Sequence, residues 1–195
     1  MKMHRLRFFS TIVTVFCLVC PGLLFAEIPI ITEFMASNNS VLVDEDGDYS
    51  DWIEIHNPGP SIENLAGWYL TDDADNLTKW QFPDISIGVD EYLVIFASDK
   101  DRAAAESELH LNFKLSSGGE YLALVEADGI TIAYEYAPEF PAQRTDISYG
   151  ISGGIYGYFL EPTPGAINDT SVFSDFVSDP TFSIEHGFFD TAFQV

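Results

Sequence analysis

The sequence predicts an all-β protein, an immunoglobulin-like antiparallel β-sandwich. Short runs in which apolar and polar residues alternate recur along residues 27–159, and clusters of Asn, Asp, Gly and Pro separate them. Such alternation places every second side chain on one buried face of a sheet. Of the 195 residues, 47% are apolar and 14% aromatic, which is enough for the core of one domain of ordinary size and a fragment of another.

The first half of the chain contains four expected strands. Trp52–Ile55 alternates cleanly, and the turn cluster Asn57–Pro60 follows it, as Pro and Gly favour tight turns. Gly67 then opens a second aromatic run. In order, the expected strands cover residues 27–36, 52–55, 62–65 and 68–71.

The second half continues this pattern, with one exception. Tyr92–Ala97 (YLVIFA) is the most hydrophobic run after residue 26, which indicates a strand buried on both faces. Asp99–Glu108 alone has helical propensity, and we expect a helical turn within a surface loop. Asp128-Gly129 marks a hairpin. The other expected strands cover residues 85–87, 109–115, 120–126, 130–136, 147–150 and 156–159.

The first 26 residues have the features of a secretory signal peptide. A basic start is followed by the apolar run Phe8–Phe25, and Ala26 is a small residue at the expected cleavage position. The alternative is an uncleaved membrane anchor, because the apolar run is close to the length that spans a bilayer. Cys17 and Cys20 both lie in this segment, so the mature chain has no disulfide, thiol nucleophile or Cys-based zinc site.

The charge of the chain restricts its partners. The formal net charge is −23. Residues 27–195 hold five basic groups against 31 acidic ones, a formal charge of −26. Such a surface repels nucleic-acid phosphates and anionic lipid, so we expect no nucleic-acid partner and no membrane contact after signal cleavage. It suits divalent cations, high salt or a basic partner.

An acidic loop is the strongest candidate site. Asp44, Asp46, Asp48 and Asp51 alternate around a glycine, and calcium takes six to eight such oxygen ligands. Further ligands are available in a second acidic segment, at Asp72, Asp73 and Asp75. The spacing does not match an EF-hand loop, because Gly47 precedes Asp48 and Ile55 stands at the twelfth position. The alternative is a solvated turn in which Asp and Gly suit the backbone.

Other catalytic and binding chemistry has little support. The scattered histidines His56, His110 and His186 lack metal-ligand spacing, and no G-x-S-x-G nucleophile motif is present. Carboxylates are too abundant for a glycosidase pair to be inferred. The tryptophans, with the tyrosines, offer a sugar-stacking platform, although core packing and cross-strand pairing is the favoured interpretation. The tryptophans are Trp52, Trp68 and Trp80.

A series of motifs resembles the lamin tail domain in its bacterial, secreted form, and covers residues 28–168 in the expected order. His56 departs from the aromatic residue more usual there, and Ile151 from a basic one. The motifs are Ile31–Ala36, Asp51–Ile55, Asn57–Gly59, Leu65–Asp72, Lys79–Pro83, Phe96–Ser98, Asn112–Leu115, Gly119-Glu120, Ser148–Gly150 and Pro162–Asn168.

The resemblance implies an immunoglobulin-like sandwich that serves binding or scaffolding and carries no catalytic residues. In such exported proteins the domain is one module among several, beside kinase-like, nuclease, sugar-binding or adhesion domains. In nuclear lamins it contacts DNA or proteins, and the negative charge of this chain argues against the DNA role. Residues 180–195 are similar to the opening of a chitobiase C-terminal or fibronectin-type-III-associated module.

We therefore expect a secreted or cell-surface protein with four parts. They are a signal peptide (1–26), a lamin-tail-like sandwich (27–168), an acidic linker (169–179) and the truncated start of a second β module (180–195). The expected function is that of a non-catalytic interaction or scaffolding module, with a protein or cell-surface glycan as partner. The alternative is a calcium-stabilised or carbohydrate-binding accessory module of an extracellular enzyme whose catalytic domain lies outside this chain.

Overall fold

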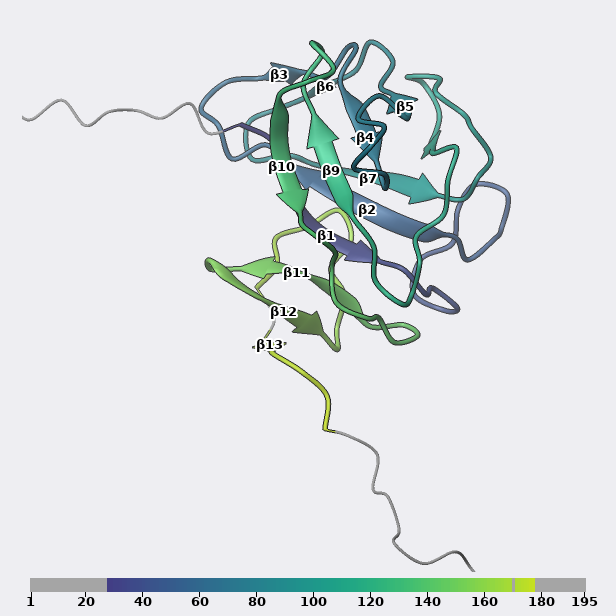
Figure 1. The fold of residues 1–195 in the computed structure, drawn as a ribbon, viewed down its shortest axis with the longest axis vertical. Helices are drawn as coiled ribbons and strands as arrows, with labels where there is room; N and C mark the ends of the chain where they lie inside the picture. The colour runs from purple at the N-terminus through teal and green to yellow at the C-terminus, as the bar shows by residue number, and fades with distance from the viewer. Residues whose placement is uncertain (1–27, 170, 178–195) are drawn as a thin grey trace, which may run out of the picture.

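The computed structural model describes residues 28–169 and 171–177, and in this part of the chain every regular element is a strand (Figure 1). The expected all-β, immunoglobulin-like sandwich is therefore confirmed. The predictions for residues 1–26, residues 180–195 and His186 concern positions outside the described residues. The strands are β1 (Ile30–Met35), β2 (Asp51–His56), β3 (Glu63–Asn64), β4 (Tyr69–Thr71), β5 (Trp80–Gln81), β6 (Ser86–Ile87), β7 (Tyr92–Ala97), β8 (Leu109–His110), β9 (Leu122–Val125), β10 (Ile132–Tyr136), β11 (Ser148–Ser152), β12 (Ile155–Phe159) and β13 (Val172–Phe173).

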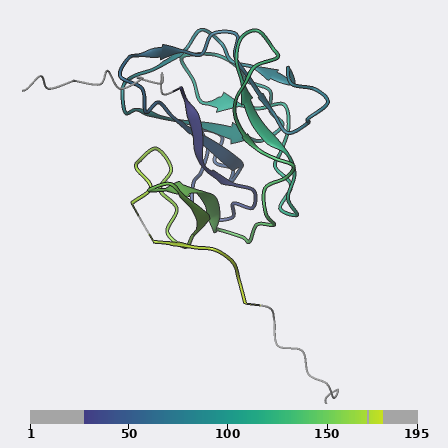
Figure 2. The same ribbon diagram turned by 60° about the vertical axis from the view of Figure 1, so that its left-hand side comes forward.

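Two sheets form the sandwich. The larger has the order β13-β12-β11-β1-β2-β7-β8, the smaller β10-β9-β4-β5, and a separate ribbon pairs β3 with β6. All pairs are antiparallel except β7–β8. Figures 1 and 2 show β1 beside the late β11–β12 hairpin, and Glu33 of β1 is in register with Gly150 of β11. The first strand is thus completed on one side by residues far along the chain.

Alternation along the strands builds the core between the two sheets. Ile53 and Ile55 of β2 point inward with Ile95 of β7, and they are fully buried against Leu70 and Leu124 of the smaller sheet. The same alternation sends residues 52, 54 and 56 to the opposite, outer face of the larger sheet.

That outer face is also covered. Val41 and Leu42 pack over Met35, Trp52 and Phe96 at one end of it. Residues 162–168, here called the closing segment, bind the carboxylates in the middle of the same face. Both faces of β1 and β2 are therefore buried, which alternation alone does not predict.

One glycine is required by the closeness of two strands. A Cβ added to Gly150 would lie 2.0 Å from the carbonyl oxygen of Thr32. Any larger residue would push β11 away from β1.

Three segments differ from expectation. Residues 99–108 form no helix; instead Arg102 makes an isolated bridge with His110, and a turn follows. The expected strand 109–115 is regular only at Leu109–His110, because β8 pairs with β7 over two residues, although the inward side chains beyond it stay buried. Within the expected linker 169–179, β13 pairs with β12, so the larger sheet extends into this segment.

Candidate functional site

The acidic loop, residues 44–48, closes around a lysine. The Nζ atom of Lys100 lies 2.7 Å from Asp44 Oδ2, 2.8 Å from Asp46 Oδ2 and 2.9 Å from Asp48 Oδ2. Arg102 adds a second cation, with NH2 2.8 Å from Asp46 Oδ2. Three of the four predicted calcium ligands are thus brought together, around a side chain more than fifty residues away in sequence.

Asp44 is the centre of this loop. Its side chain is fully buried. It accepts hydrogen bonds from the amides of Asp46 and Asp48 at 3.1 and 3.0 Å and from the Ser50 hydroxyl at 2.8 Å. Burial alone would raise the pKa of Asp44, but the hydrogen bonds from Lys100, Ser50 and the two amides lower it to about 2. Asp44 therefore carries a negative charge throughout the neutral range.

The geometry is compatible with a metal ligand set. One oxygen from each of Asp44, Asp46 and Asp48 lies within 4.8 Å of the others, and within the described residues no other three acidic or His side chains approach in this way. A divalent cation bound to these oxygens would take the place of the Lys100 ammonium. Calcium binding at these oxygens would therefore compete with the lysine contact.

The remaining predicted ligands lie elsewhere. Asp51 accepts a hydrogen bond from the Asn38 amide at 3.3 Å, and burial raises its pKa to about 6. Asp72 forms an ion pair with Lys79, while Asp73 accepts a hydrogen bond from the Asp75 amide at 2.9 Å. The second acidic segment has local partners and does not extend the Asp44 cluster.

The candidate sugar-stacking tryptophans belong to the core. Trp52, Trp68 and Trp80 are 0, 8 and 3% exposed, so none presents a face to a sugar. His110 is equally buried, and its Nδ1 lies 2.8 Å from the Ser98 hydroxyl. These residues stabilise the sandwich.

A pair of buried carboxylates escaped the sequence analysis. Glu33 and Glu54 are cross-strand partners on β1 and β2, and both are fully buried. Glu33 accepts hydrogen bonds from the Ser148 hydroxyl and from the amide and hydroxyl of Thr163, the latter at 3.0 Å. Glu54 accepts from the Gly165 amide at 2.7 Å. The two carboxylates thus hold the closing segment against the sheet.

Burial governs the ionisation of this pair. The pKa of Glu54 is raised to about 7: burial is the largest cause and the nearby charge of Glu33 adds to it, while hydrogen bonds from Thr32 and Gly165 lower the pKa. The pKa of Glu33 is raised as well, by the same loss of water. The sequence held one signal for this pair: each of two otherwise apolar runs contains an acidic residue. Alternation places both of these residues on the outer face of the larger sheet.

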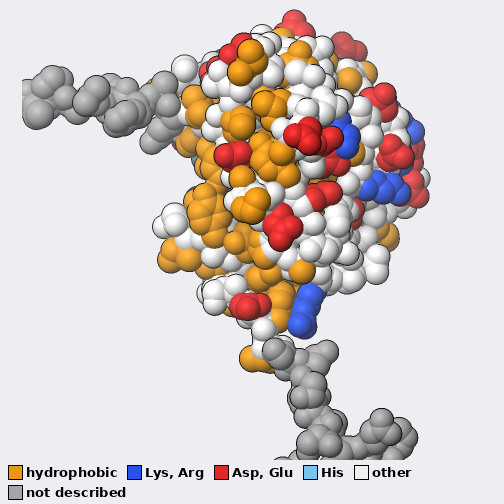
Figure 3. Space-filling model, in the orientation of Figure 1, with side chains coloured by type: hydrophobic (Ala, Val, Ile, Leu, Met, Phe, Trp, Pro, Cys, Tyr) orange, Lys and Arg blue, Asp and Glu red, His pale blue; other side chains and the backbone are white. Residues whose placement is uncertain are grey.

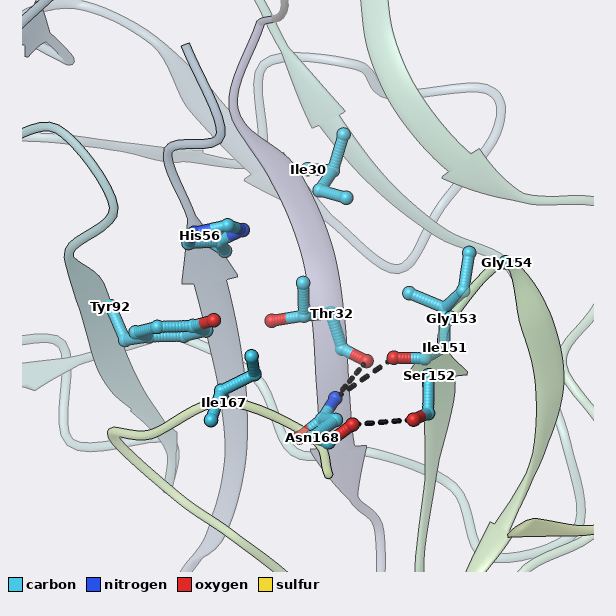
Figure 4. Close-up of a pocket in the computed structure, with 10 residues that line it drawn as sticks. All are labelled: Ile30, Thr32, His56, Tyr92, Ile151, Ser152, Gly153, Gly154, Ile167 and Asn168. Carbon is cyan, nitrogen blue, oxygen red and sulfur yellow. Dashed lines mark hydrogen bonds between the residues drawn. The ribbon is translucent and has the colours of Figure 1, made fainter. Parts of the chain in front are cut away.

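Beside this pair lies a pocket of about 260 Å³, here called the outer pocket (Figure 4). The ends of β1, β2 and β7 form one side of it, and the β11–β12 turn with the closing segment forms the other. The rings of His56 and Tyr92 stack at 4.3 Å on the first side. Ile30, Ile151 and Ile167 supply apolar walls. The outer pocket combines an aromatic stack, an apolar lining and a few polar atoms, as ligand sites do.

The surrounding surface is acidic with an apolar area. Figure 3 shows acidic side chains spread over one face with few basic ones, and apolar side chains gathered over β10 and the β11–β12 hairpin. Ile132, Ile155 and Tyr156 are 39, 62 and 48% exposed there. The described part of the chain contains no helix long and apolar enough to cross a membrane.

Comparison with known proteins agrees with the fold. The sequence model of the family described as Lamin Tail Domain matches residues 29–138. This range contains β1 to β10, with the acidic loop and the Glu33–Glu54 pair, whereas β11, β12 and the closing segment follow it. No curated protein matches the chain. The matched range spans more than half of the sequence, so this chain belongs to the lamin tail domain family.

Proposed function

We propose that this chain is a non-catalytic interaction or scaffolding module of an exported or cell-surface multidomain protein. Membership of the lamin tail domain family carries this proposal, because that domain is an immunoglobulin-like, non-catalytic unit. The residues with unusual ionisation support it. Asp44, Glu33 and Glu54 all hold parts of the fold together, and their oxygens point at internal donors.

The exposed apolar residues support a binding role. Ile132 lies on β10, an edge strand of the smaller sheet, and Ile155 and Tyr156 lie on β12. Apolar side chains gathered on a surface mark contact areas for other proteins. The export part of the proposal rests on the basic and apolar character of residues 1–26.

Binding is tested with the full chain immobilised on a surface. Secreted and envelope proteins of the organism that makes it are passed over the chain, and captured proteins are purified and titrated by calorimetry. A saturable complex of fixed stoichiometry with one purified protein is the expected result. Turnover of a glycan, peptide or nucleic acid by the chain would contradict the proposal.

The second candidate function is a calcium-stabilised or carbohydrate-binding accessory module of an extracellular enzyme. The gathering of Asp44, Asp46 and Asp48 favours its calcium part. Its sugar-binding part has no tryptophan platform to support it, because the rings of all three tryptophans are buried.

A further inference from the structure

Two hydroxyl oxygens in the outer pocket, those of Thr32 and Tyr92, can accept hydrogen bonds from a ligand. The Thr32 hydroxyl donates its single proton to Glu54 Oε1 at 2.6 Å, so its oxygen can only accept from a ligand. Figure 4 shows the Tyr92 hydroxyl pointing toward that of Thr32. No described residue forms a hydrogen bond with the Tyr92 hydroxyl. Both oxygens are therefore available to a ligand that carries hydrogen-bond donors.

The outer pocket also lies in a negative field. Burial raises the pKa of Tyr92, and the nearby carboxylates of Glu54 and Asp90 raise it further by smaller amounts. The Asp90 carboxylate is 82% exposed at the rim, with Oδ1 3.9 Å from His56 Nε2. Burial lowers the pKa of His56 despite Asp90, so at neutral pH its ring adds no positive charge.

The basic residues of the described chain leave this field uncompensated. None of them lines the outer pocket. Lys79 pairs with Asp72, and Lys100 and Arg102 hold the acidic loop. Arg144 lies over the Phe176 ring, 4.0 Å from its centroid, and Lys114 lines a separate hollow beside Asp51. A cation in the outer pocket would therefore have to come from a partner.

The volume and the lining of the outer pocket further restrict the kind of ligand that it can hold. Drug-sized ligands occupy pockets of about 300–1,000 Å³, so 260 Å³ suits a single side chain. The walls of Ile30, Ile151 and Ile167 match an aliphatic stem. A guanidinium group presents five donors in a fixed fork, which can reach two oxygens at once, and it is more weakly hydrated than an ammonium group.

We propose that the outer pocket receives an arginine side chain presented by a basic protein partner, with the guanidinium group between the oxygens of Thr32 and Tyr92. The proposal rests on the interaction role given above and names the chemistry of the partner. The formal charge of −26 on residues 27–195 would steer such a partner toward the chain.

The test is an NMR titration of the full, isotopically labelled chain. The ligand is the blocked peptide Gly-Ser-Arg-Ser-Gly, and the matched ligand replaces arginine by citrulline, which has nearly the same shape and no charge. We expect the arginine peptide to shift the amide signals of Thr32, Gly153 and Gly154 and to bind at least tenfold more tightly than the citrulline peptide. The lysine peptide should bind more weakly than arginine.

Two variants locate the site without disturbing the core. Ile167→Lys places a competing ammonium at a residue that is 64% exposed, and should weaken arginine binding at least fivefold. Its control is Ile130→Lys, with the same charge change at a 76% exposed residue in the β9–β10 turn of the other sheet. Tyr92→Phe keeps the ring stack and removes one oxygen, and should weaken binding severalfold.

Equal affinity for arginine and citrulline peptides, or shifts confined to the acidic loop, would overturn the inference. So would equal weakening by Ile167→Lys and Ile130→Lys, because this would show general charge attraction. A purified partner that binds the native chain and Ile167→Lys equally well would overturn the arginine pocket and leave the interaction role standing. The absence of any saturable partner in the capture experiment would remove the interaction role itself.

Discussion

The Nζ atom of Lys100 lies 2.7 Å from Oδ2 of Asp44, whose side chain is fully buried. The two residues join the loop before β2 to the loop after β7, 56 positions apart. A buried carboxylate that loses its cation keeps its desolvation cost, so this contact is worth more than an exposed ion pair.

We expect Lys100→Met to destabilise the chain by about 2–4 kcal/mol, because Asp44 loses its cationic partner. The measurement is urea unfolding at pH 7 in the presence of chelator. Lys114→Met is the matched control, since it removes one positive charge from an exposed residue, and it should change stability by less than about 0.5 kcal/mol. Equal effects of the two changes would show that the cluster adds no stability.

Calcium should act mainly on the variant that lacks the ammonium. Millimolar calcium should raise the unfolding midpoint of Lys100→Met, because Asp44, Asp46 and Asp48 are then free to bind an ion, and magnesium should have little effect. A calcium concentration of a hundred times Kd would add about 2.7 kcal/mol.

The native chain decides the calcium-stabilised alternative. A large calcium-specific rise in its own midpoint, lost on changing Asp46 and Asp48 to Asn, would establish a metal site that displaces Lys100. No rise in either protein would end the calcium hypothesis.

Stability should fall as the pH rises from 5 to 7.5. The pKa of Glu54 is about 7 in the folded chain, well above its ordinary value of 4.5, so the folded state holds its proton through a range in which the unfolded state has lost it. Asp51, with a pKa of about 6, acts in the same direction. We expect a loss on the order of 1–3 kcal/mol, measured by urea unfolding at the two pH values.

Below pH 4 the trend should reverse. The lowered pKa of Asp44 means that its contribution is present above about pH 4 and lost as the pH falls toward 2. Glu54→Gln should flatten the slope between pH 5 and 7.5, whereas Glu139→Gln, at an exposed residue, should leave it unchanged. A slope that survives Glu54→Gln would assign the effect to other groups.

Gly150→Ala should cost about 1–3 kcal/mol or more, because the added methyl group would lie 2.0 Å from the Thr32 carbonyl oxygen and separate β1 from β11. Thermal unfolding measures the change. Gly118→Ala is the control, since its nearest neighbour would be the Ser116 hydroxyl at 3.6 Å. Similar midpoints for both variants would mean that the two strands can move apart at little cost.

Asn168→Ala should loosen the closing segment. Its side-chain amide donates to the carbonyl oxygens of Thr32 and Ile151 at 3.0 and 3.1 Å. We expect faster hydrogen exchange of the Thr163 and Gly165 amides, with β9 unchanged, and a loss of about 1–3 kcal/mol. The exposed Asn39→Ala should alter neither, and uniform acceleration across β9 would point to general destabilisation instead.

Alternation predicted the strands that form both faces of the core. The expected runs 52–55 and 92–97 agree closely with β2 and β7, because the first alternates around Ile53 and Ile55 and the second is a continuous run of apolar residues. The segment 99–108 did not follow its local propensity, since its backbone bonds to residues 110–113 instead. Tertiary pairing decided the structure of that loop.

The candidate sites were less predictable. The spacing of Asp44, Asp46 and Asp48 correctly indicated convergent carboxylates, yet nothing in the spacing pointed to Lys100. Glu54 stands where alternation predicts solvent, and only the closing segment, more than a hundred residues later, removes it from water. Contacts between distant segments leave no periodic signal in a single sequence.

The position of the closing segment also has a consequence for the order of folding. During synthesis residues 162–168 emerge after every strand except β13, and until then Glu33 and Glu54 face water and ionise freely. β1 likewise lacks a neighbour on one side until β11 arrives. A nascent chain that reaches only Pro138, the end of the family match, therefore has an open edge at β1 and two carboxylates without their closing-segment donors. The closing segment completes the burial of these carboxylates late in synthesis.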